Sequence, residues 1–184
     1  MEAIISTEKM TEKRAGARNL EAEFGDFCSG VHEKLVRALS LYCGDIDVAE
    51  EMAQEALAVA WRDWAKLKNV ESPEGYVVKT GLNLCNSSFR RKAAERRAEK
   101  RLRRSLSQSH STEETVPPQS VMVRELLAAL PRRQRTALVL RFFLDLSVAS
   151  TAELMDISEG TVKALTSHAT SNLRNKLATE RSDR

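Results

Sequence analysis

Residues 146–163 read LSVASTAELMDISEGTVK, and this stretch predicts a short helix, a tight turn and a second helix. Ser147 and Ser158 stand where the two helices would begin, and serine at such a position caps free backbone N–H groups. Asp156 stands at the turn, where the backbone often adopts a left-handed conformation that aspartate tolerates. The pattern is typical of a helix-turn-helix whose second helix enters the major groove of DNA, with a plain helical hairpin as the alternative.

The second helix of this motif has an apolar stripe, which predicts its buried side. The stripe consists of Val162, Ala169, Leu173 and Leu177. The residues that this leaves facing outward are Lys163, Ala164, Ser167, His168 and Ser171. Free N–H groups at the amino end of the helix, together with Lys163, suit a DNA phosphate.

The composition of the whole chain favours an all-α protein. The 184 residues, 30% charged and 42% hydrophobic, are typical of a soluble globular chain of one or two domains. Glycine and proline are few (7 and 4), and strand-like alternation of polar and apolar residues is hard to find. No apolar run approaches a membrane span or a secretory signal, so we expect a cytoplasmic protein with no membrane insertion. The net charge is only +3, so affinity for nucleic acid must come from local basic patches.

Nothing in the sequence predicts an enzyme. We find no Ser/His/Asp set, no glycine-rich phosphate loop and no pair of carboxylates with a partner, so no catalytic residue and no cofactor are expected. Cys28 and His32 lie four residues apart on one helix and could form half of a metal site, but the other half is missing and no metal is expected. Cys43 and Cys85 complete a scattered set of three cysteines, which predicts reduced thiols.

Two helices are predicted at the start of the first half of the chain. The first has an apolar residue at every fourth position, namely Phe27, Val31, Leu35 and Leu39, and it ends at Gly44 and Asp45. The second begins near Asp47 and has a core side that extends to Trp64. Its other side is acidic and amide-rich, with Asp47, Glu50, Glu51, Gln54 and Glu55. That acidic surface is either a solvated helix face or a docking site for a basic partner protein.

A third helix is predicted from about Pro73 to beyond Arg91, after a loop over residues 66–73. One of its faces carries Tyr76, Lys79, Asn83, Asn86 and Arg90 at helical spacing. A basic run continues it, with nine Lys and Arg against two Glu between residues 86 and 104. Such runs are often plain solvated surface, but amides, cations and an aromatic on one face also suit melted, single-stranded DNA.

These patterns divide the chain into five segments. Residues 1–23 are expected to form a polar extension that is loosely ordered or partly helical, residues 24–98 a first helical domain, and residues 99–120 have the composition of a flexible linker. Residues 121–178 form a second helical domain, and residues 179–184 a tail. In the second domain Val123, Leu126, Leu127 and Leu130 are expected to face inward, and residues 132–144 to form one helix.

Several of these motifs together resemble one family. Residues 47–55, DVAEEMAQE, are similar to region 2 of bacterial sigma-70 factors, and Asn83 with Arg90-Arg91 matches the segment that follows it. Residues 130–135, LPRRQR, resemble region 4 together with Leu140-Arg141 and the helix-turn-helix. No other sigma region fits between the two, so the chain resembles the small extracytoplasmic-function RNA polymerase sigma factors, in particular actinobacterial members. The resemblance implies a region 2 bundle of three or four helices, joined by a flexible linker to a region 4 helix-turn-helix domain.

The resemblance also implies partners and roles. The partners would be core RNA polymerase, promoter DNA in double-stranded and melted form, and a regulator of the anti-sigma type. The acidic surface, Asp47, Glu50, Glu51, Gln54 and Glu55, would bind the clamp helices of the polymerase, and the second domain would bind its flap. The melted −10 element would be captured by Lys66, Lys68, Asn69, Tyr76, Lys79, Asn83, Asn86, Arg90 and Arg91. The −35 duplex would be read by Arg141, Ser158, Thr161, Lys163, Ala164, Ser167 and His168.

The sequence departs from the family pattern at several positions. Tyr76 stands for the usual Trp, Ser87 for a common Asp, and Ser150 for the Glu that would complete a capping box with Ser147. Leu165 and His168 stand where the recognition helix typically carries Arg. We therefore expect weaker −35 recognition that relies on apolar contact with thymine methyl groups.

Two further interpretations stay open on the sequence alone. A conventional helix-turn-helix regulator with a helical sensory or dimer domain would share the C-terminal motif, but it would need neither the acidic surface nor the Asn83 and Arg90 stripe. A polymerase-binding adaptor without promoter selection would keep the acidic surface and tolerate the missing cations of the recognition helix.

Overall fold

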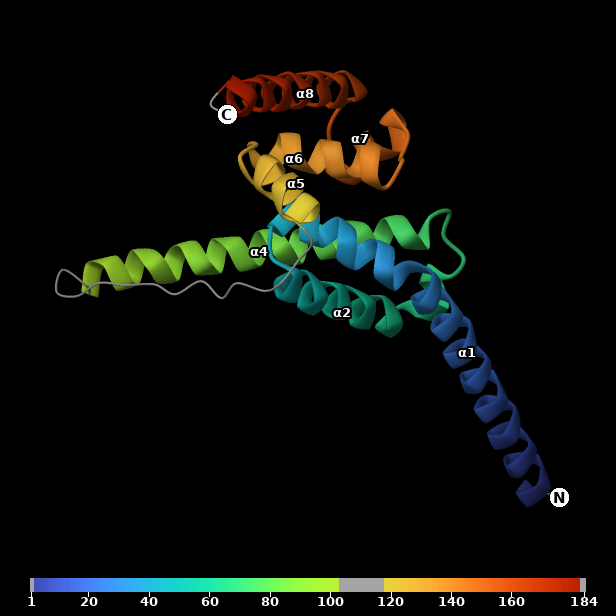
Figure 1. The fold of residues 1–184 in the computed structure, drawn as a ribbon. Coiled ribbons are helices and arrows are strands. Elements are labelled where there is room, and N and C mark those ends of the chain that lie inside the picture. The colour runs from blue at the N-terminus through green and yellow to red at the C-terminus, as the bar shows by residue number, and fades with distance from the viewer. Residues whose placement is uncertain (1, 103–117, 183–184) are drawn as a thin grey trace.

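The computed structural model describes residues 2–102 and 118–182, and the described chain is all-α, as predicted (Figure 1). The first part contains α1 (Glu2–Cys43), α2 (Ile46–Arg62), α3 (Trp64–Leu67) and α4 (Pro73–Leu102). The second part contains α5 (Pro118–Ala128), α6 (Arg132–Leu138), the π-helical segment η1 (Val139–Phe143), α7 (Val148–Met155) and α8 (Glu159–Ser182). Of the predicted linker, residues 103–117 lie outside the described residues, as do Arg103 and Arg104 of the basic run and residues 183–184 of the tail.

The core of the first part lies where α1, α2 and α4 pack together. Val31, Leu35 and Leu39 of the predicted stripe are buried there, and Phe27 is half-buried at the edge. The buried side of α2 is made largely of alanine, which lets α1 and α4 approach it closely. α1 and α4 lie close together at Gly81, where an added Cβ would lie 2.9 Å from Leu39 Cδ1.

The break between α1 and α2 is local in origin, as predicted. Gly44 has a φ of 81°, a left-handed conformation that glycine adopts without steric cost, and its N–H donates to Ser40 O at 2.8 Å. Asp45 then caps α2, because its side chain accepts a hydrogen bond from the Val48 N–H at 3.2 Å.

The second part contains the predicted helix-turn-helix. Ser147 Oγ accepts from the Ser150 N–H at 3.0 Å, and Ser158 Oγ accepts from the Thr161 N–H at 3.2 Å, so each serine caps its helix. Asp156 takes the left-handed conformation between the two helices, with a φ of 53°. Figure 1 shows α5, α6 and α7 lying between α8 and the layer of α1 and α4, so α8 forms the outer surface of this part.

Several details of the sequence prediction differ from the structure. The extension, expected to be loosely ordered or partly helical, is helical from Glu2 and continues into α1 without a break, because residues 2–23 contain no proline and are rich in Glu and Ala. Residues 99–102 and 118–120 of the predicted linker and residues 179–182 of the predicted tail belong to α4, α5 and α8. Trp64 lies in α3 and not at the end of α2. Val123 and Leu177, expected to be buried, are 47% and 36% exposed, because the described helices around them leave their side of α5 and α8 partly uncovered.

The predicted helix over residues 132–144 changes its winding part-way. From Val139 it becomes π-helical, with Leu144 N–H donating to Val139 O at 3.0 Å, five residues back. Val139 and Leu140 are both buried in this wider turn, whereas Phe142 points away from the core and is 66% exposed.

Membrane-spanning helices and clustered metal ligands are both absent from the described residues. No helix in the described ranges is both long enough and apolar enough to cross a membrane. No group of three or more His, Cys, Asp and Glu side chains in the same ranges is arranged to hold a metal ion. Cys28, Cys43 and Cys85 are free thiols.

The left-handed turn at Asp156 yields a stability prediction. Glycine relieves the steric strain of a Cβ at this φ, so Asp156→Gly should raise the free energy of unfolding by about 0.5 kcal/mol, measured by urea unfolding. The matched control is Ala149→Gly in α7, which should lower the same free energy by about 0.5–1 kcal/mol because it only adds backbone entropy to the unfolded chain. Equal losses in both variants would show that the turn at Asp156 is unstrained.

Candidate nucleic-acid interface

One face of α4 presents most of the residues predicted to capture the −10 element. Tyr76, Lys79, Asn83 and Arg90 are exposed, and Asn86 is half-buried. Three of them line one cavity of about 180 Å³, whose walls are Lys79, Leu82, Asn83, Asn86, Arg133, Thr136, Leu154 and Met155. The structure therefore brings two amides and a cation of the predicted site together, but the other wall of their cavity comes from α6 and α7.

Asn86 is the most firmly held residue of this face. The hydroxyl of the buried Tyr42 donates to Asn86 Oδ1 at 2.6 Å. Burial raises the pKa of Tyr42, which keeps its hydroxyl protonated and able to donate. Arg90 is held from the same helix, since its Nη2 donates to Ser87 Oγ at 3.0 Å. A second cavity, of about 400 Å³, is lined by Asn83, Asn86, Ser87, Arg90 and Arg132.

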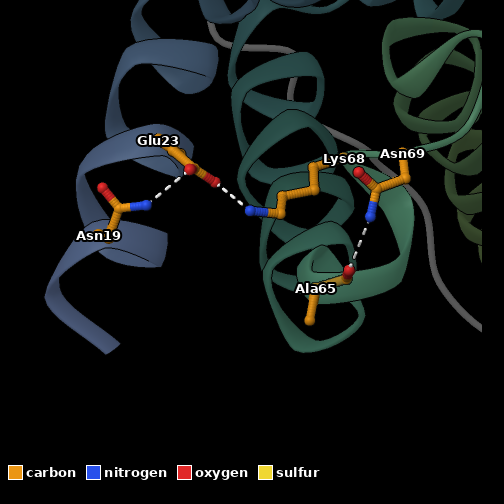
Figure 2. Close-up of polar contacts among 5 residues, drawn as sticks. All are labelled: Asn19, Glu23, Ala65, Lys68 and Asn69. Carbon is orange, nitrogen blue, oxygen red and sulfur yellow. Dashed lines mark hydrogen bonds and ion pairs between the residues drawn. The ribbon is translucent and has the colours of Figure 1, made fainter. Parts of the chain in front are cut away.

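The remaining predicted −10 residues lie before α4 and beyond its middle. Lys66 is on α3, and Lys68 and Asn69 open the connection between α3 and α4. Figure 2 shows that Lys68 points to Glu23 of α1 (Nζ to Oε2, 2.6 Å) and that Asn69 Nδ2 donates to Ala65 O at 3.4 Å. Arg91 Nε, on α4, lies 3.8 Å from Glu95 Oε1, so the Arg91 side chain lies along its own helix and pairs with a residue one turn further on.

The acidic surface is present on α2 as predicted from its spacing. Asp47, Glu50, Glu51, Gln54 and Glu55 are all exposed. They lie opposite the alanine-rich side that packs against α1 and α4, so the core fixes the direction in which the carboxylates face.

The second helix of the helix-turn-helix presents the predicted −35 residues unequally. Ser158, Lys163, Ala164, Ser167 and His168 are exposed, and Thr161 is half-buried. The Ser158 and Thr161 hydroxyl groups form a hydrogen bond with each other at 2.9 Å (Oγ to Oγ1). Lys163 Nζ lies 4.0 Å from Glu159 Oε2. Arg141 is half-buried, and its Nη1 donates to Leu146 O, which holds the chain just before α7. Leu165, one of the two positions that lack the usual Arg, is half-buried, whereas His168 is exposed.

A buried arginine that the sequence prediction did not single out joins the two parts of the chain. Arg135 is 8% exposed and donates to Tyr42 O and Ala128 O, both at 2.6 Å, and to Leu130 O at 3.2 Å. Tyr42 lies in the last turn of α1, and Ala128 is the last residue of α5, so one guanidinium satisfies carbonyls at two helix C-termini. Burial lowers the pKa of Arg135, but the three carbonyl acceptors keep a charged guanidinium favourable at this position.

The sequence does contain a signal for this residue. Arg135 precedes the buried Leu138 and Val139 by three and four positions, so the helical period places it on the core side of α6. A second contact joins the same surfaces, since the Arg132 guanidinium lies 4.5 Å from the centre of the Phe89 ring of α4. Together these contacts hold α6 against the face of α4 that carries Asn83 and Asn86.

An apolar groove of about 390 Å³ is the other feature that sequence patterns missed. Its walls come from α1, α5, α6, η1 and α8, and they are Leu41, Val123, Leu127, Leu138, Val139, Phe142, Phe143, Thr170 and Leu173. Val123 and Phe142 at its edge are among the most exposed large apolar side chains in the described chain.

Family comparisons agree with this division of the molecule. The family model "Sigma-70 region 2" matches residues 30–95, and "Sigma-70, region 4" matches residues 120–173. The chain belongs to the sigma-70 family. It is a promoter-recognising sigma factor of RNA polymerase, which confirms the resemblance found in its sequence and argues against a conventional helix-turn-helix regulator.

Individual relatives give the same picture. This sigma factor is 25% identical over 155 residues to the RNA polymerase sigma-E factor of Streptomyces coelicolor. The aligned region covers 84% of this chain and 86% of the relative. Its fold is similar to that of the sigma factor RpoE of Bartonella quintana, solved with the anti-sigma factor NepR (TM-score 0.64, 18% identity, 85% of this chain and 97% of that one). It is also similar to that of CnrH, solved with the cytosolic domain of CnrY (TM-score 0.62, 19% identity, 86% of this chain and 90% of that one).

The bridging role of Arg135 can be tested by removing its charge. Arg135→Met keeps much of the side-chain volume but leaves three carbonyls without their donor, so the free energy of unfolding should fall by about 2–4 kcal/mol. The radius of gyration from small-angle scattering should also increase as region 4 separates from region 2.

The control for that variant is Arg133→Met, which removes an exposed cation from the same helix and should change the stability by less than about 0.5 kcal/mol. A radius of gyration that stays the same in Arg135→Met would show that other contacts hold the two parts together.

Proposed function

We propose that this sigma factor acts by binding alone, through separate surfaces for the polymerase, the −10 element and the −35 element. The observation that carries the proposal is that regions 2 and 4 match in order and that the residues expected at each contact lie on the matching helices. Because its partner polymerase works on chromosomal DNA, we assign the protein to the cytoplasm.

The −10 element is assigned to the exposed face of α4 and to the connection before it. Asn83 and Asn86 offer amide groups that can bond the edges of unpaired bases, and Lys79 and Arg90 offer cations for the backbone. Tyr76, 36% exposed in the first turn of α4, offers a ring on which a base can stack. Holding bases in the unpaired state lowers the free energy of the melted promoter without any chemical step.

The −35 duplex is assigned to the amino-terminal half of α8. Its first turn offers free backbone N–H groups and Lys163 to a phosphate, while Ala164, Ser167 and His168 can reach base edges in the major groove. Arg141 is assigned a supporting role here, since its bond to Leu146 O holds the entry to α7.

The acidic surface of α2 is assigned to the polymerase. Four carboxylates and one amide on a single exposed helix face complement a basic partner surface, and they would speed association and fix its orientation. Regions 2 and 4, connected by residues 103–117, would then occupy their two promoter elements as linked sites, which raises the effective concentration of the second contact.

We infer that full contact with the −10 element requires the arrangement held by Arg135 to open. Arg132, Arg133 and Thr136 of α6 line the same cavities as Asn83 and Asn86, so α6 limits the room for an unpaired base beside these two amides. We infer that the closed form is a resting form, and that polymerase binding supplies the free energy for opening.

An anti-sigma regulator is proposed as a further partner. The similar sigma factor RpoE was solved with the anti-sigma factor NepR, and CnrH was solved with the cytosolic domain of CnrY. This chain has an apolar groove between α1 and region 4 that suits an amphipathic helix. A helix in that groove would contact both parts of the chain and so stabilise the closed form.

A polymerase-binding adaptor with reduced −35 reading is the second candidate. It is favoured by one observation, the absence of Arg at Leu165 and His168. Of these two positions, Leu165 is half-buried and His168 is exposed, so an arginine at residue 168 is the one of the two that could present its side chain to DNA.

The first experiment is binding to core RNA polymerase, followed by transcription from a library of randomised −35 and −10 sequences. We expect tight binding and selective initiation. Glu51→Lys should weaken polymerase binding about ten-fold by reversing a charge at the centre of the acidic surface, whereas Asp26→Lys, an equally exposed site on α1, should not. Binding without initiation would favour the adaptor, and no binding would remove the sigma assignment of these surfaces.

The recognition helix yields a prediction of gained function. His168→Arg should strengthen binding of the full-length protein, with core polymerase, to a −35 duplex by about five-fold, since a new guanidinium contact to a base or phosphate is worth about 1 kcal/mol or more. Asn175→Arg adds the same charge to an exposed position two turns further along α8 and is the control. An equal gain in both variants would mean that α8 attracts DNA without reading it.

A further inference from the structure

The segment just before the region 2 match is built into the fold. The family model begins at residue 30, but Leu20, Phe24 and Phe27 of α1 already pack on the core. The Phe24 ring centre lies 5.0 Å from those of Trp61 and Trp64, and the Phe27 ring centre lies 4.7 Å from that of Trp64. This aromatic cluster fixes residues 20–27 against the end of α2 and against α3, directly beside the start of the connection to α4.

One ion pair links this segment to that connection (Figure 2). Glu23 Oε2 accepts from Lys68 Nζ at 2.6 Å, and Glu23 Oε1 accepts from Asn19 Nδ2 at 2.8 Å, one helical turn away. The side chains of Lys68 and Glu23 are 30% and 38% exposed, so this ion pair is partly shielded from water. The pairs Glu33–Arg37, Arg62–Asp63, Arg91–Glu95 and Glu159–Lys163 join residues at most four apart and have side chains at least 45% exposed, whereas Glu23 and Lys68 lie 45 residues apart.

The connection itself, residues 68–72, is held by hydrogen bonds at both ends, and the Asn69 and Val70 N–H groups also donate to Lys66 O and Leu67 O, but its middle residues are exposed. At one end the Lys68 N–H donates to Trp64 O at 3.0 Å, and at the other Ser72 Oγ accepts from the Gly75 N–H at 3.0 Å to cap α4. Between them Asn69, Val70 and Glu71 are exposed. The ammonium group of Lys68 points to Glu23, whose carboxylate offsets its charge and so weakens its attraction for a DNA phosphate.

We propose that Glu23 is a positioning residue for −10 recognition: held by Asn19, it fixes Lys68 and thereby the exposed middle of the connection 68–72 that meets the unpaired −10 bases. The inference rests on the proposed assignment of this connection to the −10 element. It changes the role of Lys68 from a DNA ligand to a support, and it makes residues 19–27 part of the unit that reads the promoter.

The test uses full-length protein with core polymerase and compares initiation from a preferred −10 sequence with initiation from single-base variants of it. Glu23→Gln and Lys68→Met should each reduce this selectivity by about three-fold, the effect of losing one partly exposed ion pair. The double variant should lose no more than either single variant, because both remove one interaction. Glu21→Gln, exposed on the same helix, is the control and should retain full selectivity.

The salt dependence of DNA binding distinguishes two roles for Glu23, namely positioning Lys68 and masking the charge of Lys68. If Glu23 only masked a DNA-binding lysine, Glu23→Gln would leave selectivity intact, and its binding to single-stranded −10 DNA would weaken with salt more steeply, by about 0.7 in the logarithmic slope. That result, or unchanged selectivity in both variants, would overturn the proposal. Failure of the −10 assignment itself would be seen separately, as a wild-type protein that shows no −10 selectivity or an Asn83→Ala variant that keeps all of it.

Discussion

The arrangement of this sigma factor depends on one buried cation. The last carbonyls of a helix have no partner within the helix, and the partial negative charge gathered there favours a cation. Arg135 meets two such ends at once, that of α1 in region 2 and that of α5 in region 4. Its guanidinium is planar and carries five donors in fixed directions, so it can bond carbonyls from different helices with less loss of side-chain entropy per bond than the flexible lysine side chain. The two halves of the molecule therefore share a polar contact that neither half could satisfy alone.

In the closed form this contact restricts the surface assigned to the −10 element. Arg135 holds α6 at the end of α1 and Arg132 lies over Phe89 of α4, so the amides assigned to unpaired bases form cavities with residues of region 4. The recognition helix α8, in contrast, lies on the outer surface. A molecule built in this way can present the helix assigned to the −35 element while part of the face assigned to the −10 element is restricted by α6, so the two proposed promoter contacts need not form in the same step.

The long α1 helix extends region 2 toward its N-terminus. Phe24 and Phe27 pack against Trp61 and Trp64, and this aromatic cluster holds residues 20–27 against the rest of region 2. The ion pair between Glu23 and Lys68 then links this segment to the connection before α4. An apolar contact supplies the stability, whereas the ion pair supplies direction, since an ion pair of this exposure adds little to the free energy of unfolding.

The sequence by itself determined the features that depend on neighbours within one helical turn. The caps at Ser147 and Ser158, the left-handed turn at Asp156, the break at Gly44 and the exposed acidic side of α2 all follow from local spacing, and the structure agrees with each. The tertiary structure alone decided the burial of Arg135, the tie between Tyr42 and Asn86, the direction of Lys68 and the exposure of Val123 and Leu177. Each of these depends on which helix from a distant part of the chain covers the residue, and helical periodicity predicts only that a side is suited to burial, not what covers it.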